Sequence, residues 1–362
     1  MYKRIEVFIA ACFYYSGLVK LALWWKQRSS SSLTILIYHR ASGGDLRKHM
    51  LHLSRHYRVL HLEAALEELY AARKSKHVRS KRRPALVLTF DDGYHDNYTH
   101  AFALASELHI PITIFLIPGY IENGHRFWWE EGTQLVSRTQ VRAAAIEGRM
   151  YHLDQPDERR ALAQVIYTRA RHAASVAERE EFLIAVRRTL AVPPRIASEE
   201  KALLPLTRAE VQEMEQSGWV SFGAHTMNHP ILAYLRDPAE AQYEVSECRA
   251  VLERQLGHPP STFAYPVGET EHIGEIGLRA AREAGYDWAV TALPGFNTPQ
   301  TDPHLLHRLM VDVDQHWLVV AAKASGVWSA FTRLYRTPLS FIHKLLVIAH
   351  QPSFPRRSEK GT

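Results

Sequence analysis

Cysteine is scarce in this 362-residue chain, which contains only Cys12 and Cys248. Two cysteines so far apart provide neither a disulfide framework nor a zinc–thiolate site. The chain also lacks a glycine-rich phosphate-binding loop and any visible internal repeat. No nucleic-acid-binding signature is present, so we expect no nucleic-acid partner.

The excess of basic over acidic residues is also small, because the net charge is only +6. Part of it lies in the basic segment at residues 73–83, which we interpret as a solvated loop before the next strand. Attraction to anionic lipid headgroups or to an acidic polymer is the alternative. Nucleic acid fits less well, because no aromatic residues are interleaved with these charges. A hydrophobic content of 46% supports a large core.

Two short clusters carry the chemistry of the sequence. Residues 89–94 read Thr-Phe-Asp-Asp-Gly-Tyr, and residues 225–230 read His-Thr-Met-Asn-His-Pro. Together they supply two adjacent carboxylates and two imidazoles, enough for one divalent-metal site with a free carboxylate beside it. A hydrolase that attacks an unactivated amide needs both a metal that acidifies water and a base that takes the proton.

The spacing of the histidines is not sufficient evidence by itself. His52 and His56 have the same spacing, and a chain with 21 histidines is expected to contain such a pair by chance. They lie in a basic stretch where Asp45 is the only nearby carboxylate. We interpret this pair as an exposed helix face.

The context of the two clusters favours a site. Residues 85–90 form a short apolar run typical of a buried strand, and both aspartates follow it directly. Residues 219–224 also read as a strand, and His225 follows at once. The carboxyl ends of parallel strands are where α/β folds build their sites. If the next turn is helical, His225 and His229 share one face and bind one ion.

This combination resembles the NodB-type polysaccharide deacetylases of carbohydrate esterase family 4, from about Leu33 to about Asp314. The resemblance implies that Asp91 is the catalytic base and that Asp92, His225 and His229 bind the metal. The residues alone do not distinguish the roles of the two aspartates. Zinc is the expected metal, and cobalt or nickel also suits a site of two histidines and one aspartate.

The later motifs of that family match less well. The third motif is usually Arg-x-Pro-aromatic-Gly, and Ala264 stands where its arginine would be. Arg308 is the candidate that replaces it as the partner of Asp91. The fourth motif survives only as Asp287-Trp288, and core packing is the alternative role for Trp288. The predicted substrate-binding residues are Tyr94, Tyr265, Pro266, Gly268, Trp288 and Arg308.

Two histidines compete for the role of general acid. His307 fits the Leu-x-His motif that many family members place late in the domain. His39 ends the apolar run at 34–38, which resembles the opening strand of the poly-N-acetylglucosamine deacetylases, whose acid comes from that strand. A structural hydrogen bond is the alternative role for either residue. We favour His39.

The alternation of elements predicts an α/β fold, a distorted (β/α) barrel of the polysaccharide deacetylase type with a helical insertion. The barrel domain is expected at 31–320, with the insertion at 126–206 either shaping the substrate cleft or covering the barrel. The sequence Phe-Trp-Trp at 127–129 opens this insertion. Strands are expected at 33–38, 57–60, 85–90, 112–117, 219–224, 262–265, 287–291 and 306–311. Helices are expected at 62–73 and 238–256.

The two ends of the chain differ from the barrel. Residues 7–25 are apolar and aromatic and contain one charge, Lys20. A membrane-associating helix at 1–30, either spanning the bilayer or lying on it, is preferred to a cleaved signal peptide, because no small-residue cleavage site precedes Trp24. The serines at 29–32 form a flexible linker. Residues 321–362 are expected to be helical and then disordered.

These observations predict a metal-dependent hydrolase that removes N-acetyl groups from the amino-sugar units of a polysaccharide. Its partners are expected to be an acetylated polysaccharide or oligosaccharide and a membrane surface in a bacterial cell envelope. Two alternatives remain, an amide hydrolase acting on a non-sugar substrate and a catalytically silent carbohydrate-binding or scaffold protein.

Overall fold

The computed structural model describes residues 2–28, 32–71, 82–193 and 201–333. The predictions made for the serines at 29–31, for the basic segment at 73–81 and for the tail beyond 333 lie outside these residues.

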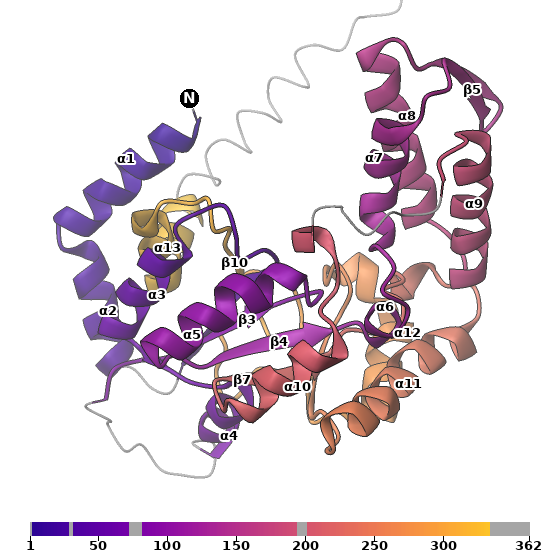
Figure 1. Cartoon of the computed structure of the whole chain (residues 1–362). Helices are drawn as coiled ribbons and strands as arrows, with labels where there is room; N and C mark the ends of the chain where they lie inside the picture. The colour runs from indigo at the N-terminus through magenta and orange to yellow at the C-terminus, as the bar shows by residue number, and fades with distance from the viewer. Residues whose placement is uncertain (1, 29–31, 72–81, 194–200, 334–362) are drawn as a thin grey trace, which may run out of the picture.

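The centre of the molecule is one sheet in which every strand pair is parallel (Figure 1). Its order is β10-β1-β3-β4-β7-β8-β9, and β2 pairs with β3 beside this path. The strands are β1 (Leu33–Tyr38), β2 (Arg58–Val59), β3 (Ala85–Phe90), β4 (Ile112–Leu116), β7 (Val220–Ala224), β8 (Thr262–Ala264), β9 (Trp288–Val290) and β10 (Leu309–Met310).

One extended segment brings the two edges of this sheet together. Leu306 forms a parallel bridge with Val290 of β9, and Leu309, three residues later, pairs with Leu36 of β1. The sheet therefore curves into a distorted barrel, as predicted. All eight predicted strands are present, with ends that differ by a few residues.

The barrel buries two apolar layers because side chains on a strand alternate between its faces. Ile35, Val87 and Phe115 point inward and form one cluster with the helix α4 (Leu62–Ala71). This cluster also contacts Trp288, the first residue of β9, so α4 lies at the amino ends of the strands. The carboxyl ends, at the opposite rim, are left for the site.

The outer layer packs against surrounding helices. These are α3 (Leu46–His56), a π-helical segment (Asn97–Phe102) that leads into α5 (Ala103–Leu108), α10 (Arg208–Gln216), α11 (Pro238–Leu256), α12 (Thr270–Glu283) and α13 (Trp317–Ser325). The predicted helices at 62–73 and 238–256 are therefore present over their described residues.

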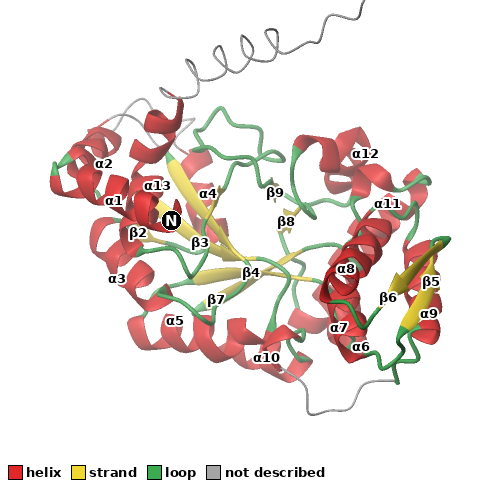
Figure 2. Ribbon diagram, turned by 90° about the horizontal axis from the view of Figure 1, so that it is seen from above, coloured by secondary structure: helices red, strands yellow, loops and turns green. Residues whose placement is uncertain are grey.

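The insertion forms a separate layer beside the barrel (Figure 2). The short helix α6 (Pro118–Asn123) leads into it. Its elements are α7 (Trp128–Arg138), the hairpin of β5 (Ala143–Ile146) and β6 (Arg149–His152), α8 (Pro156–Arg171) and α9 (Val176–Thr189). It has its own apolar core, which also includes Tyr94, Ile117 and Tyr120 at the rim of the barrel. The hairpin was not predicted, because its first strand is rich in alanine. The turn Glu147-Gly148, with φ values of 51° and 73°, allows the reversal.

The N-terminal helices α1 (Tyr2–Tyr15) and α2 (Leu18–Arg28) lie on the side of the barrel opposite the insertion in both views (Figures 1 and 2). Many of their apolar contacts are made with α13. The domain boundary expected between residues 320 and 321 falls within this helix. The prediction of an exposed face for His52 was wrong. His52 is buried against the rings of Tyr14 and Trp317. Both rings are at least 38 residues away in the sequence, so the local pattern does not show this burial.

Among the described residues, no single helix is long and apolar enough to cross a membrane. Lys3–Tyr15 and Leu18–Arg28 reach the required length and hydropathy only together, as a pair bent by 62°.

Candidate active site

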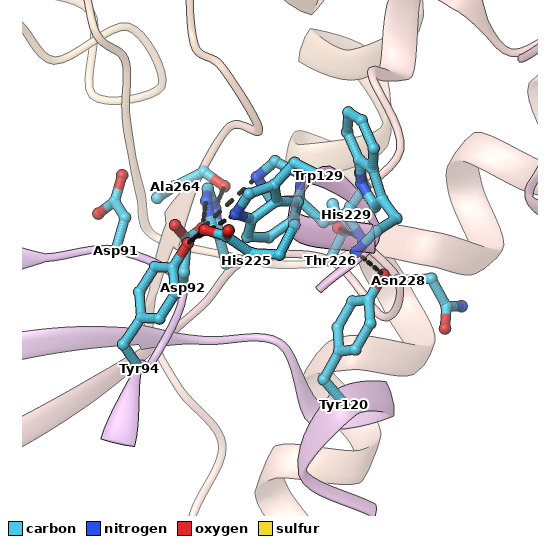
Figure 3. Close-up of polar contacts among 12 residues, drawn as sticks. Asp91, Asp92, Tyr94, Tyr120, Trp129, His225, Thr226, Asn228, His229 and Ala264 are labelled. Atoms are coloured by element: carbon cyan, nitrogen blue, oxygen red, sulfur yellow. Dashed lines mark hydrogen bonds and ion pairs between the residues drawn. The ribbon is translucent and has the colours of Figure 1, made fainter. Parts of the chain in front are cut away.

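The two predicted clusters meet at the carboxyl ends of β3 and β7. Asp91 and Asp92 follow β3, His225 follows β7, and these three residues and His229 are buried. Asp92 has a φ of 73°, so the backbone turns sharply between the two aspartates. The Asp92 carboxylate consequently faces the imidazoles, whereas the Asp91 carboxylate lies to one side (Figure 3).

The Asp92, His225 and His229 side chains form a group that fits a metal ion. Asp92 Oδ1 lies 3.5 Å from Nε2 of His225 and 3.6 Å from Nε2 of His229. Ligands about 2.0–2.2 Å from a tetrahedral zinc ion are separated by about 3.3–3.6 Å, which matches these distances. The donor set of two imidazoles and one carboxylate would leave a fourth position of a bound ion open, as in catalytic zinc sites.

Hydrogen bonding prepares His225 as a ligand. Its Nδ1 lies 2.7 Å from the carbonyl oxygen of Ala264, so that Nδ1–H donates and the lone pair of Nε2 faces Asp92. Burial lowers the pKa of His225, but Asp92 and Asp91 raise it by more, and the result lies above the ordinary value. Burial and the charge of His225 lower the pKa of His229 well below its ordinary value, which keeps that ring neutral.

Asp91 has a different partner. The Arg308 guanidinium donates to both carboxylate oxygens, at 2.7 and 2.8 Å. Arg308 is 1% exposed and also donates to the carbonyl of Thr291 at 2.8 Å and to the hydroxyl of Thr89 at 3.2 Å. Burial raises the pKa of Asp91, but the charges of Arg308 and His225 lower it by more, so the carboxylate is ionised at neutral pH. The candidate replacement for the missing third-motif arginine therefore contacts Asp91.

The two candidate acids lie in different surroundings. His39 follows β1 and is half-buried, and it lies at the same rim as Asp91, because Tyr38 before it pairs with Phe90 before Asp91. His307 precedes Arg308 on an extended segment, so its side chain points to the other face. The ring of His307 packs against Gly295, and its backbone pairs with the side chain of Asn297.

The loop that carries the histidines is not helical. Thr226 and His229 have φ values of 63° and 55°, and these left-handed conformations bring the two rings together in place of a shared helix face. The Thr226 hydroxyl accepts a hydrogen bond from the His229 amide at 2.9 Å. Glu244 on α11 accepts from the amide and the side chain of Asn228, at 2.8 and 2.7 Å.

Two residues of the insertion also fasten this loop. The indole N–H of Trp128, on α7, donates to the carbonyl oxygen of His229 at 3.0 Å. Arg179, on α9, is 3% exposed and donates to the carbonyl oxygen of Asn228 at 3.0 Å. The sequence did not reveal the roles of Arg179 and Glu244, and Trp128 was noted only as part of the Phe-Trp-Trp sequence that opens the insertion. Arg179 and Glu244 are charged residues on helices whose packing partners the sequence does not show.

Trp129 and Tyr94 form one wall of the site. The rings of Trp129 and His229 are 4.5 Å apart, and the Trp129 indole N–H donates to the Tyr94 hydroxyl at 2.6 Å. That hydroxyl lies 3.3 Å from the carboxylate of Glu130. Burial raises the pKa of Tyr94 well above its ordinary value, so the hydroxyl keeps its proton and donates to Glu130.

The remaining predicted substrate-binding residues make structural contacts. Trp288 packs with the apolar cluster at the amino ends of the strands, which supports its alternative role in the core. Tyr265 is 1% exposed, and its hydroxyl donates to the carbonyl oxygen of His304. Gly268 follows Pro266 in the loop after β8, and a Cβ there would lie 2.6 Å from the amide nitrogen of Ala292. The glycine is therefore required for this close approach.

Comparison with known proteins agrees with this geometry. The family described as polysaccharide deacetylase matches residues 79–164 and 177–289, more than half of the chain. The Bacillus subtilis protein YxkH, whose name assigns it to the polysaccharide deacetylases, is 23% identical over 292 residues, which cover 80% of this chain and 74% of YxkH.

Solved structures share the fold. The Streptococcus pyogenes deacetylase PplD, in complex with acetate, has a TM-score of 0.52 and 18% identity, covering 82% of this chain and 99% of PplD. A de-N-acetylase from Aggregatibacter actinomycetemcomitans has a TM-score of 0.51 and 15% identity, covering 81% of this chain and all of the other. Because the family model matches more than half of its residues, the chain belongs to the NodB-type polysaccharide deacetylase family and is a hydrolase of that family.

Proposed function

We propose that this hydrolase removes N-acetyl groups from amino-sugar units of a polysaccharide with the help of a divalent metal. One observation carries the proposal. A buried group of Asp92, His225 and His229 lies beside a second carboxylate, Asp91, that is ionised and fixed by Arg308. Amide hydrolysis needs this separation between a metal site and a base.

Asp92, His225 and His229 would hold the ion, zinc by preference and cobalt or nickel as alternatives. When bound, the ion would polarise the acetamide carbonyl and lower the pKa of water. Asp91 accepts the proton of the attacking water. A backbone amide near Tyr94 donates to the oxyanion, where a preorganised dipole is most effective.

His39 protonates the departing amine in this proposal. The support is the register of the sheet, in which Tyr38 before His39 pairs with Phe90 before Asp91, so both side chains lie at the same rim. His307 is a weaker candidate, because it neighbours Arg308 on an extended segment and points away from the carboxylates. An amine leaves poorly unless it is protonated as the carbon–nitrogen bond breaks, so one acid is required.

The wall of Trp129 and Tyr94 supports a sugar substrate. An exposed part of an aromatic ring beside the reacting group offers a flat apolar surface for the apolar face of a pyranose ring. PplD, a deacetylase of similar fold, has been solved with acetate, which is the product expected here.

The test is acetate release from N-acetylglucosamine oligomers and from poly-N-acetylglucosamine, with and without added zinc. We expect release by the wild-type protein and loss of release in Asp91→Asn. Hydrolysis of simple acetanilides without any release from the glycans would replace this proposal with an amide hydrolase that acts on non-sugar substrates.

We also propose that residues 1–28 attach the protein to a membrane of a bacterial cell envelope. The support is the concentration of exposed aromatic and aliphatic side chains in α1 and α2.

A further inference from the structure

Exposed hydrophobic side chains are concentrated in α1 and α2. Seven of the eleven large hydrophobic residues that are exposed in the described part of the chain lie between Ile5 and Trp25. On α1, Ile5, Phe8 and Tyr15 are exposed and share a helical stripe with Cys12. A patch of this kind on a folded domain marks an interaction surface. The exposed residues that form it are Ile5, Phe8, Tyr15, Leu18, Leu21, Trp24 and Trp25.

The opposite faces of the same helices are bound to the domain. Ala10 is fully buried among Leu318, Val319 and Ala322 of α13. The Lys26 ammonium donates to the carbonyl oxygen of Ala324 at 3.0 Å and to the hydroxyl of Thr34, the second residue of the barrel, at 3.2 Å. Helices inserted across a bilayer would leave the apolar face of α13 exposed to water. The two helices are therefore apolar on both sides, and only one side is used within the fold.

The length of the helices also disfavours a span. The 14 residues of α1 and the 11 of α2 give rods of about 21 Å and 16 Å at 1.5 Å per residue. The hydrocarbon core of a bilayer is about 30 Å thick. The 62° bend between the helices prevents them from acting as one long rod while they are packed on the domain.

Charge and aromatic content identify the partner as a lipid surface. Arg4, Lys20 and Arg28 are exposed on these helices, and Glu6 is the one exposed acid. The guanidinium of Arg28 lies 3.9 Å from the ring centre of Trp24. Tryptophan and tyrosine side chains favour the headgroup level of a bilayer, and basic side chains are attracted to anionic headgroups.

We propose that α1 and α2 form a monotopic membrane-binding surface that rests on an anionic bilayer and does not cross it. The seven exposed residues would enter the headgroup and upper acyl region, while the inner faces stay packed on α13. This proposal rests on the membrane attachment proposed above and defines its mode. Vesicle binding measured without substrate tests it independently of the deacetylase activity.

Cys12 provides the measurement, because it is exposed on the stripe and Cys248 is buried. The full-length protein is labelled at Cys12 with a fluorophore and mixed with vesicles of phosphatidylethanolamine and phosphatidylglycerol. Nitroxide quenchers are placed either near the headgroup or at the end of the acyl chain. We expect stronger quenching by the shallow nitroxide. Stronger quenching by the deep one would overturn the proposal, because Cys12 would lie near the middle of a span.

A substitution series tests the surface itself. Phe8→Ser/Trp25→Ser should weaken partition to these vesicles by about tenfold or more, because each side chain loses apolar burial. The matched control is Met150→Ser/Ile184→Ser, which changes two exposed apolar residues of the insertion and should leave partition unchanged. Equal partition of all three proteins, or no partition of the wild type, would refute the surface. Removing phosphatidylglycerol should weaken binding by about tenfold, and unchanged binding would refute the anionic preference.

Discussion

The two halves of the site are stabilised in different ways. The Asp91 half belongs to the barrel, because Arg308, Thr89 and Thr291 that surround it all come from barrel strands or the segments that continue them. The histidine half is a loop with two left-handed residues, and its carbonyl groups are bound by side chains from the insertion.

This difference separates the proposed base from the proposed metal site. Fixing the base requires a charged partner within the barrel, where a buried carboxylate would otherwise be costly. Fixing the loop requires donors for carbonyl groups that no helix or strand satisfies. The insertion supplies those donors, so its role extends beyond covering the barrel. Four substitutions test this division, from the largest expected effect to the smallest.

Arg308→Met should damage the base and leave the metal site intact. It leaves Asp91 buried without a countercharge, so the free energy of unfolding should fall by about 3–5 kcal/mol. The rate of deacetylation should fall on the order of 10²-fold, because the base loses its orientation. Metal affinity, measured by competition with a chromogenic chelator, should change little.

The double variant Asp91→Asn/Arg308→Met is the control for this effect. It removes the buried charge together with its partner, so most of the lost stability should return while activity stays absent. A large loss of metal affinity in Arg308→Met would contradict the division into two halves.

Arg179→Met should have the opposite profile. The carbonyl of Asn228 loses its donor, so the loop should become less ordered and metal affinity should fall by about 10–100-fold, the range for residues that orient metal ligands. At saturating metal, most of the deacetylation rate should return. Arg187→Met is the matched control, because Arg187 lies on the same helix and pairs with Glu131, away from the loop. Equal metal affinities in the two variants would contradict the role of Arg179.

Glu244→Gln should have a smaller, pH-dependent effect. Burial raises the pKa of Glu244 above its ordinary value of 4.5. The folded protein therefore keeps this proton to a higher pH than the unfolded chain does. The stability that the group contributes is full below pH 4.5 and is lost as the pH rises through the raised pKa.

Chemical denaturation at a series of pH values checks this. The stability of the wild type relative to Glu244→Gln should decrease from pH 4.5 upward, and a constant difference would contradict the assignment. Metal affinity of the variant should fall only several-fold, because glutamine retains one acceptor for Asn228.

Trp129→Phe should have the smallest effect. The ring beside His229 is retained, while the hydrogen bond from the indole N–H to the Tyr94 hydroxyl is lost, which costs about 0.5–1.5 kcal/mol. We expect a severalfold rise in KM for the glycan with an unchanged metal affinity. Trp128→Phe, by contrast, removes the donor to the His229 carbonyl and should weaken metal binding. The reverse pattern in these two variants would exchange the assigned roles.

The strands and the acidic cluster were predictable from the sequence because their signals are local. The apolar run at 85–90 ends directly at Asp91, and the geometry of parallel strands places that end at the site. Arg308 was identified through the absence of an arginine at Ala264, and its contact with Asp91 crosses more than two hundred residues of sequence.

The fastening of the histidine loop was not predictable, because it depends on tertiary contacts. Arg179 and Glu244 resemble ordinary charged residues on amphipathic helices, and nothing local shows that they face the loop. The burial of His52 was missed for the same reason, since its cover comes from Tyr14 and Trp317. The sequence motif Asp287-Trp288 suggested substrate binding for Trp288. Its position at the start of β9 instead places it against the core.

The most direct test of the account is a metal titration of Asp91→Asn and Asp92→Asn by calorimetry, with acetate release measured on the same samples. We predict that Asp91→Asn binds one zinc ion with nearly the wild-type affinity and releases no acetate. Asp92→Asn should bind zinc with an affinity reduced by about 100-fold or more. Loss of zinc from Asp91→Asn with retention in Asp92→Asn would contradict the assignment of one carboxylate to the base and the other to the metal.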